Sequence, residues 1–311
     1  GYDSAGIAVL DSQTRGGLQR LRSVGRVSEL AAQADKTSAP IGIAHTRWAT
    51  HGVPSERNAH PHISGGLAVV HNGIIENFAE IKAGLIAKGY AFVSDTDTEA
   101  IAHLLSDTLK TVPDLFEAVR VATTRLIGAY AIAVLREGEQ RVVVARNGAP
   151  LLLGVAKDGA YAASDTSALL QVTKTIVYLE DGDIAELSSS GYRIMEASGR
   201  AADRPQHEST LSADAVELGQ YRHYMQKEIF EQPQALANTL EMIGGAQSLA
   251  ANVFGATAPD IFAASKSVLI LACGTSYHAG LVARYWIEQL AKLPCTVEIA
   301  SEYRYRESVP N

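Results

Sequence analysis

Hydrophobic residues follow two different spacings along residues 1–196, and the order of these spacings narrows the possible folds. Short apolar runs and alternating patterns bounded by turn residues predict strands over 5–10, 17–22, 41–46, 67–71, 129–135, 141–145, 151–155, 175–179, 183–187 and 192–196. Between the fourth and fifth of these, apolar residues recur at three and four and predict helices over 77–88, 97–110 and 114–125. Strands, then helices, then strands predict a layered α+β domain rather than alternating βαβ units.

A change in composition marks the end of this domain. Residues 197–219 are polar and rich in Ala, Ser and Asp, which predicts a linker. Residues 220–311 then begin a second region with a helical pattern that Pro233 is expected to stop or restart. The apolar run from Val268 to Cys273, a small polar turn and a further helical pattern predict the start of an α/β domain. A chain of 311 residues is long enough for about two domains.

Charge and cysteine usage exclude several classes of partner. The net charge is −7 and the basic residues are scattered, so a nucleic-acid partner is not expected. No segment approaches the roughly 20 apolar residues of a membrane span. Cys273 and Cys295 form neither a disulfide framework nor a metal-ligand spacing, which favours the cytoplasm. Cys273 ends an apolar run, and we expect it to be buried by packing rather than to act as a nucleophile.

Five of the nine histidines, His45, His51, His60, His62 and His71, lie in or near one loop-like segment. Imidazole is a common metal ligand, but no carboxylate or thiol cluster completes a tetrahedral set. No metal and no organic cofactor are therefore expected. The alternative is that these histidines are satisfied by neighbouring polar groups.

Three further features suggest a pocket for an α-amino acid. Arg47 ends a predicted strand and could bind a carboxylate, although an ion pair is the ordinary alternative. Asp97 begins a predicted helix and could bind an ammonium group or act only as a cap. Asn72 and Gly73 end another predicted strand, where they form either a simple turn or the two donors of an oxyanion hole.

Several motifs carry a family resemblance. The segments GYDSAGIAV, GIAHTRWATHG, NAHPH, VVHNGIIEN and SDTDTE resemble, in order, the glutaminase domain of the glutamine-dependent fructose-6-phosphate aminotransferase family. The later QYRHYMQKEIFEQP and LILACGTSYHAG are similar to its connection into the sugar isomerase domain. The resemblance implies a four-layer αββα N-terminal-nucleophile (class II glutamine amidotransferase) domain over 1–196, a linker over 197–219, and connecting helices with the first part of a sugar isomerase (SIS) domain over 220–311.

The resemblance also implies roles for individual residues. Arg47 would bind the α-carboxylate of glutamine and Asp97 its α-ammonium, while Asn72 and Gly73 would form the oxyanion hole. The remaining expected residues are Thr50 and His51 in the glutamine-binding loop, Trp48 as gate of an ammonia channel, and Thr275 and Ser276 as sugar-phosphate contacts. The implied partners are glutamine, fructose 6-phosphate and a second copy of the chain in a homodimer.

In this family the attacking group is the thiol of an N-terminal cysteine. The sequence begins inside the implied motif at Gly1, so we expect the nucleophile and its strand to precede the given chain, and most isomerase residues to follow Asn311. The 311-residue polypeptide alone is therefore expected to be inactive. Two alternatives remain: another sugar-phosphate amidotransferase, and a non-catalytic sugar-phosphate sensor with a degenerate glutaminase domain. A DNA-binding sensor would need a helix-turn-helix or a basic face, and the sequence displays neither.

Overall fold

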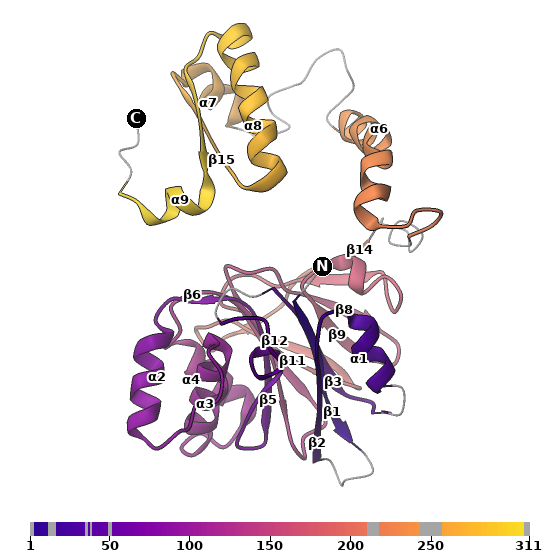
Figure 1. The fold of residues 1–311 in the computed structure, drawn as a ribbon, viewed down its shortest axis with the longest axis vertical. Coiled ribbons are helices and arrows are strands. Elements are labelled where there is room, and N and C mark those ends of the chain that lie inside the picture. The colour runs from indigo at the N-terminus through magenta and orange to yellow at the C-terminus, as the bar shows by residue number, and fades with distance from the viewer. Residues whose placement is uncertain are drawn as a thin grey trace. The chain divides into compact units, whose positions relative to one another are not determined.

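The computed structural model describes residues 3–11, 17–34, 37, 39–48, 52–209, 218–242 and 257–307. The chain divides into two compact units, Gly1–Glu217 and Leu218–Asn311. Figure 1 shows sheets and helices in the first unit and mostly helices in the second.

A seven-stranded antiparallel sheet forms the centre of the first unit. Its strands are β13 (Ala201–Ala202), β12 (Gly191–Met195), β11 (Ile184–Ser188), β7 (Val142–Asn147), β6 (Gly128–Arg136), β5 (Leu67–Ile75) and β4 (His62–Ser64), in that spatial order. In β5, Leu67 and Val69 face one core cluster, whereas Ala68 and Val70 face another. This alternation follows from the two-residue period of a strand, and because both faces are covered the first half of β5 is apolar throughout.

Three helices cover one face of this sheet: α2 (Phe78–Ala87), α3 (Asp97–Leu109) and α4 (Leu115–Thr123). Their apolar residues share one core cluster with β5, β6 and β7, and Phe116 of α4 is the largest fully buried side chain. Asp114 caps α4, because its carboxylate accepts a 3.0 Å hydrogen bond from the Glu117 amide. The sequence pattern predicted all three helices to within a few residues.

Two smaller antiparallel sheets form the second β layer. One has the order β2 (Gly17–Val24), β1 (Ser4–Asp11), β3 (Gly42–Arg47), and the other β14 (Gln206–Glu208), β10 (Thr175–Tyr178), β8 (Leu152–Ala156), β9 (Gly159–Ala163). Both pack against the face of the seven-stranded sheet that the three helices leave open. Helix α1 (Val27–Ala34) packs on β1 and β2 and completes an αββα arrangement (Figure 1). The expected fold class is therefore confirmed.

The structure corrects the start of the expected linker. Strands β13 and β14 lie within the polar segment 197–208 and pair with β12 and β10. Arg204 between them donates two hydrogen bonds, of 2.9 and 2.8 Å, to the buried carboxylate of Asp183. The polar composition misled the prediction because these short edge strands are held by backbone pairing and an ion pair rather than by an apolar face. The pattern also missed α1, β4 and β9.

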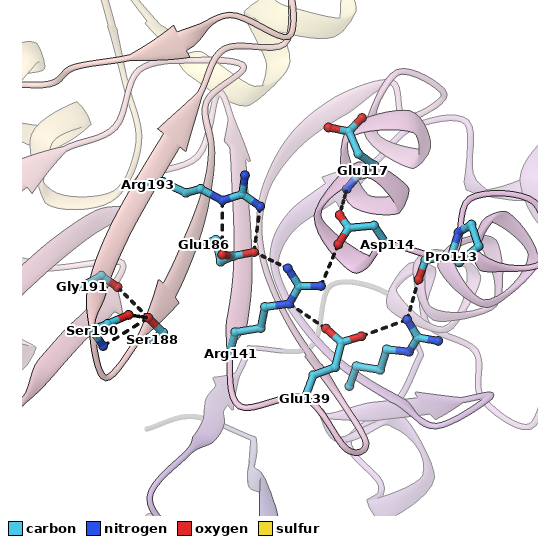
Figure 2. A network of polar contacts seen from close by, with 11 residues as sticks. Pro113, Asp114, Glu117, Glu139, Arg141, Glu186, Ser188, Ser190, Gly191 and Arg193 are labelled. Carbon is cyan, nitrogen blue, oxygen red and sulfur yellow. Dashed lines mark hydrogen bonds and ion pairs between the residues drawn. The ribbon is translucent and has the colours of Figure 1, made fainter.

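A network of charged side chains links α4 to the sheet (Figure 2). Arg141, just before β7, forms ion pairs with Asp114, Glu139 and Glu186. Arg193 of β12 also pairs with Glu186, and its guanidinium lies 4.4 Å from the centroid of the Phe116 ring. One cation thus joins the start of α4, the β6–β7 turn and β11.

The second unit begins with α6 (Tyr224–Met242), followed by α7 (Ala258–Ala264). Strands β15 (Val268–Ala272) and β16 (Cys295–Ile299) pair in parallel and are joined through α8 (Gly274–Trp286) and the π-helix Ile287–Ala291, and α9 (Ala300–Tyr305) follows. Gly280 of α8 lies so close to the strands that a Cβ there would be 3.0 Å from Ile270 and Val297. This parallel βαβ unit agrees with the α/β pattern predicted for the region.

Two expectations for this unit are wrong. Helix α6 continues through Pro233, with whole helical turns on both sides of the proline and without the amide donor that the proline lacks. Cys273 is exposed, since it is the N-cap residue of α8 at the open end of β15, and the buried thiol is that of Cys295. Among the helices that the structure describes, none is long and apolar enough to cross a membrane.

Candidate active site

A cavity of about 280 Å³ lies in the first unit, where β3, β5 and the start of α3 meet. Its lining comprises His45, Thr46, Arg47, Trp48, His60, His71, Asn72, Gly73, Ile74, Thr96, Asp97 and Thr98. Five of the residues singled out from the sequence, namely Arg47, Trp48, Asn72, Gly73 and Asp97, thus lie around one space. The chain segments that carry them are well separated in the sequence and are brought together by the sheet.

Arg47 is held at the end of β3. Its carbonyl oxygen accepts a 2.9 Å hydrogen bond from the Asp3 amide, and its Nη2 donates to the Gly52 carbonyl oxygen at 3.2 Å. The residue is 3% exposed, although it lines the cavity. Burial lowers the pKa of the guanidinium, while the nearby charges of Asp3 and Asp97 raise it. The guanidinium remains positively charged, and it is attracted to the negative charge of Asp97.

Asp97 is the first residue of α3 and is 4% exposed. Its Oδ2 accepts a 2.9 Å hydrogen bond from the Ile75 amide at the end of β5, and lies 3.8 Å from Nδ1 of His71. The N-cap position belongs to Thr96. The carboxylate of Asp97 therefore joins α3 to β5 rather than serving as a simple helix cap.

Asn72 and Gly73 do not form a turn. Strand β5 continues to Ile75, and Gly73 pairs with Tyr130 inside the ladder to β6. Gly73 has a φ of 135°, and a Cβ there would lie 2.1 Å from the Ala129 carbonyl oxygen. Only glycine fits this position. Of the two alternatives the simple turn is excluded, and the expected end of the strand at this dipeptide is wrong, because Asn-Gly also permits an irregular backbone inside a strand.

Buried histidines lie at the cavity and beside it: His60 and His71 belong to its lining, and His62 is next to His60. The Thr98 hydroxyl lies 3.0 Å from Nε2 of His60 and 3.2 Å from Nδ1 of His71, and the Thr96 hydroxyl lies 3.0 Å from Nε2 of His62. Burial lowers the pKa of His62 to about 3 and that of His60 well below its usual value. The imidazoles of His60 and His62 are therefore neutral at pH 7. In the described part of the chain, no group of three or more His, Cys, Asp or Glu residues could hold a metal ion.

The sequence analysis missed several lining residues. Thr96 and Thr98 lie in the segment SDTDTE but had no role assigned from the sequence, although both hydroxyls contact histidines. His60 was one of several histidines without an assigned role. Thr46 and Ile74 adjoin predicted site residues, and only their position in the strands reveals them.

The remaining predicted site residues are Trp48, Thr50, His51, Thr275 and Ser276. Trp48 lines the cavity and is 72% exposed, whereas Thr50 and His51 lie outside the described residues. Thr275 and Ser276 belong to the second unit, where they form the first turn of α8 after Gly274 and are exposed. The free amides of such a turn can bind an anion.

Comparison with known protein families agrees with this geometry. A model described as a glutamine amidotransferase domain matches residues 45–171, and one described as a SIS domain matches residues 261–309. The fold is similar to that of the glutamine phosphoribosylpyrophosphate amidotransferase from B. subtilis complexed with ADP and GMP, at 22% identity and a TM-score of 0.56 over 96% of this chain and 60% of that one. The chain thus carries a glutamine amidotransferase domain followed by a SIS domain.

Comparison with curated relatives identifies the family more specifically. The chain is 50% identical to a glutamine–fructose-6-phosphate aminotransferase [isomerizing] of Xylella fastidiosa (strain 9a5c), and 54% identical to that of Xanthomonas campestris pv. campestris. Each match covers 100% of this chain and 51% of the relative. The chain belongs to the family of these aminotransferases and spans about half the length of the curated relatives it matches.

Proposed function

We propose that the first unit binds glutamine and takes part in hydrolysing its side-chain amide, and that the ammonia released is used to convert fructose 6-phosphate into glucosamine 6-phosphate. The observation that carries this proposal is that Arg47 and Asp97 line the same cavity as Gly73. A cation and an anion on one small cavity match the carboxylate and ammonium groups of a free amino acid.

The proposed chemistry places the glutamine amide at Asn72 and Gly73. A thiolate attacks the amide carbon, and the carbonyl oxygen gains negative charge that the Asn72 side-chain amide and the Gly73 backbone amide stabilise. The C–N bond then breaks as the nitrogen takes up the proton given up by the thiol, ammonia leaves, and water hydrolyses the thioester to release glutamate and restore the thiol. Cys273 and Cys295 both belong to the second unit, and the proposal assigns neither of them a part in this step.

The proposal assigns the sugar phosphate to the second unit. Thr275 and Ser276 in the first turn of α8 would bind the phosphate with their hydroxyls and the backbone amides of that turn. Ammonia would add to the C2 carbonyl of fructose 6-phosphate, and loss of water with ketose-to-aldose isomerisation gives the amino sugar. Trp48 would gate the passage of ammonia, Thr50 and His51 would complete the glutamine loop, and a second copy of the chain would be the partner.

Calorimetric titration of the 311-residue chain with L-glutamine tests the glutamine site. We expect saturable one-to-one binding of L-glutamine, no binding of D-glutamine, and no ammonia release. Arg47→Lys should weaken binding about tenfold or more, because a lysine cannot reproduce the two-pronged contact with a carboxylate. Arg120→Lys, in a surface pair with Glu117, is the matched control and should bind as the wild type does. Failure of the wild-type chain to bind L-glutamine would refute the proposal.

A further inference from the structure

Asn58 lies outside the cavity lining, yet it makes a dense set of contacts next to it. It ends the short 3-10 helix Glu56–Asn58 and is fully buried. Its Nδ2 donates to the Val53 carbonyl oxygen at 2.9 Å and to Oδ2 of Asp95 at 3.1 Å, and its Oδ1 accepts from the Asp95 amide at 3.0 Å. One side-chain amide thus joins the loop after Trp48 to the segment that leads into α3.

On the loop side, the contact continues to Arg47. Gly52 lies directly against the Asn58–Asp95 pair, because a Cβ on Gly52 would be 2.6 Å from Nδ2 of Asn58 and 2.8 Å from Cβ of Asp95. The carbonyl oxygen of Gly52 accepts the hydrogen bond from Nη2 of Arg47. The Asn58–Asp95 pair therefore supports the carbonyl group that orients the Arg47 guanidinium.

On the helix side, the contact continues to Asp97. Asp95 is two residues before Asp97, and the segment preceding α3 is fixed independently by Glu99, whose carboxylate accepts hydrogen bonds from the amides of Val93 and Ser94 at 2.9 and 2.7 Å. Because Glu99 already fixes the segment before α3, the contribution of Asn58 is to connect this segment to the loop that contains Gly52 and Val53. The neighbouring ion pair between Arg57 and Asp95 also spans the gap, but both side chains are largely exposed and such pairs contribute little.

We propose that Asn58 is a positioning residue that sets the separation between the Arg47 guanidinium and the Asp97 carboxylate. The proposal rests on the proposed function, since these two groups are the ones assigned to the ends of the glutamine backbone. Asn58 acts on glutamine through other residues. Replacing Asn58 should therefore reduce the affinity for glutamine by more than the destabilisation of the fold alone would cause.

The test compares Asn58→Asp with a double exchange and a matched control. Asn58→Asp keeps the acceptor for the Asp95 amide but loses both donated hydrogen bonds and places two carboxylates together, so we expect about tenfold weaker glutamine binding in calorimetry. In Asn58→Asp/Asp95→Asn the side-chain bond is re-formed with donor and acceptor exchanged, and most of the affinity should return. Asn77→Asp is the control, because Asn77 likewise bridges the Arg125 carbonyl and the Ile127 amide at 3.0 Å each, away from the cavity lining. It should bind glutamine as the wild type does.

Hydrogen exchange without ligand provides a second readout that does not depend on glutamine. Asn58→Asp should increase amide exchange in both peptides covering residues 52–60 and 93–98, and Asn77→Asp in neither. Unchanged exchange in these peptides, or a loss of affinity in Asn58→Asp no greater than that in Asn77→Asp, would overturn the role of Asn58. If the wild-type chain fails to bind glutamine, the proposed function falls, and the exchange data alone then decide whether Asn58 couples the two segments.

Discussion

The Oδ2 atom of Asp97 accepts a 2.9 Å hydrogen bond from the backbone amide of Ile75. Ile75 ends the strand that carries Asn72 and Gly73, so one carboxylate fixes the start of α3 to that strand. In the proposed site this bond sets the distance between the group that would bind the ammonium and the donors that would face the amide oxygen. A buried hydrogen bond to an ionised group is among the stronger hydrogen bonds in a protein. Such a bond is suited to hold the start of α3 at a fixed distance from β5.

The first prediction separates the charge of Asp97 from its anchoring role. Asp97→Asn keeps an oxygen that can accept from the Ile75 amide but removes the negative charge facing the ligand. We expect the thermal unfolding midpoint to fall by a few degrees, because the bond from the Ile75 amide becomes a neutral one, and glutamine affinity to fall about 10-fold to 100-fold, since hydrogen bonds to charged groups contribute roughly 1.5–3 kcal/mol. Asp165→Asn is the control, because Asp165 caps the short helix Thr166–Ala168 outside the cavity lining. Equal affinities of the two variants would contradict an ammonium contact.

The second prediction concerns Gly73 and uses Gly89 for comparison. Gly73→Ala combines a φ of 135° with a Cβ 2.1 Å from the Ala129 carbonyl oxygen, whereas Gly89 has a φ of 91° and no atom within 4 Å of its Cβ position. We expect Gly73→Ala to lower the free energy of unfolding by about 3 kcal/mol or more, from backbone strain and overpacking together. Gly89→Ala should cost only the conformational part, about 1–2 kcal/mol. Urea unfolding measures both, and equal losses would mean that the clash is relieved by movement of β6.

Most strands and helices of the first unit were predictable because the strands are apolar runs buried on one or both faces and the helices carry an apolar stripe. The apolar run of β6, whose two faces contact different core clusters, and the helical period of α3 are visible in the sequence for this reason. The short edge strands β13 and β14 were not, because backbone pairing and the Arg204–Asp183 contact hold them, and neither leaves a periodic pattern.

The candidate site was only partly predictable from the sequence. Charged groups at element ends, such as Arg47 and Asp97, could be singled out, and their positions around one cavity agree with the expected pocket. The proposed role of Asn58 could not be predicted, because its three hydrogen bonds, to Val53 and Asp95, depend on how two loops meet rather than on local spacing. The status of Gly73 as a strand residue likewise depends on its pairing with Tyr130, which is distant in sequence.

The third prediction is a pH dependence of stability from the buried histidines. Burial lowers the pKa of His62 to about 3, while an unfolded histidine titrates near 6.5. As the pH falls through 6.5, the His62 side chain takes up a proton in the unfolded state but not in the folded state. The contribution of His62 to the free energy of unfolding is therefore complete well above pH 6.5. It decreases below pH 6.5, by up to about 1.4 kcal/mol per pH unit for each such group. His62→Gln should reduce this slope in urea unfolding by an amount that rises from near zero at pH 7.5 to nearly one proton, or about 1.4 kcal/mol per pH unit, near pH 5.5.

The control for that experiment is His207→Gln, at an exposed position in the edge strand β14. It removes an imidazole from an exposed position and provides the reference slope for His62→Gln. If the pH dependence of the free energy of unfolding does not change in His62→Gln, or changes equally in both variants, the neutral state of His62 in the folded protein is contradicted.

The last prediction addresses the charged network around Arg141 (Figure 2). Arg141→Met keeps the length of the aliphatic stem but leaves Asp114 and Glu139 without this cation, and Glu186 with Arg193 alone. Because one partly buried guanidinium serves three carboxylates, we expect the free energy of unfolding to fall by about 1–3 kcal/mol, and more at low salt than at high salt.

Arg200→Met provides the comparison, since Arg200 is 79% exposed at its side chain and pairs with Glu196 four residues away. An exposed pair of this kind contributes roughly 0.5 kcal/mol or less. Urea unfolding at low and high salt should therefore separate the two variants by at least about 1 kcal/mol at low salt. If both substitutions cost the same, the three carboxylates around Arg141 are neutralised by solvent ions as effectively as by the arginine, and the join between α4 and the sheet depends on the apolar contacts of Phe116 instead.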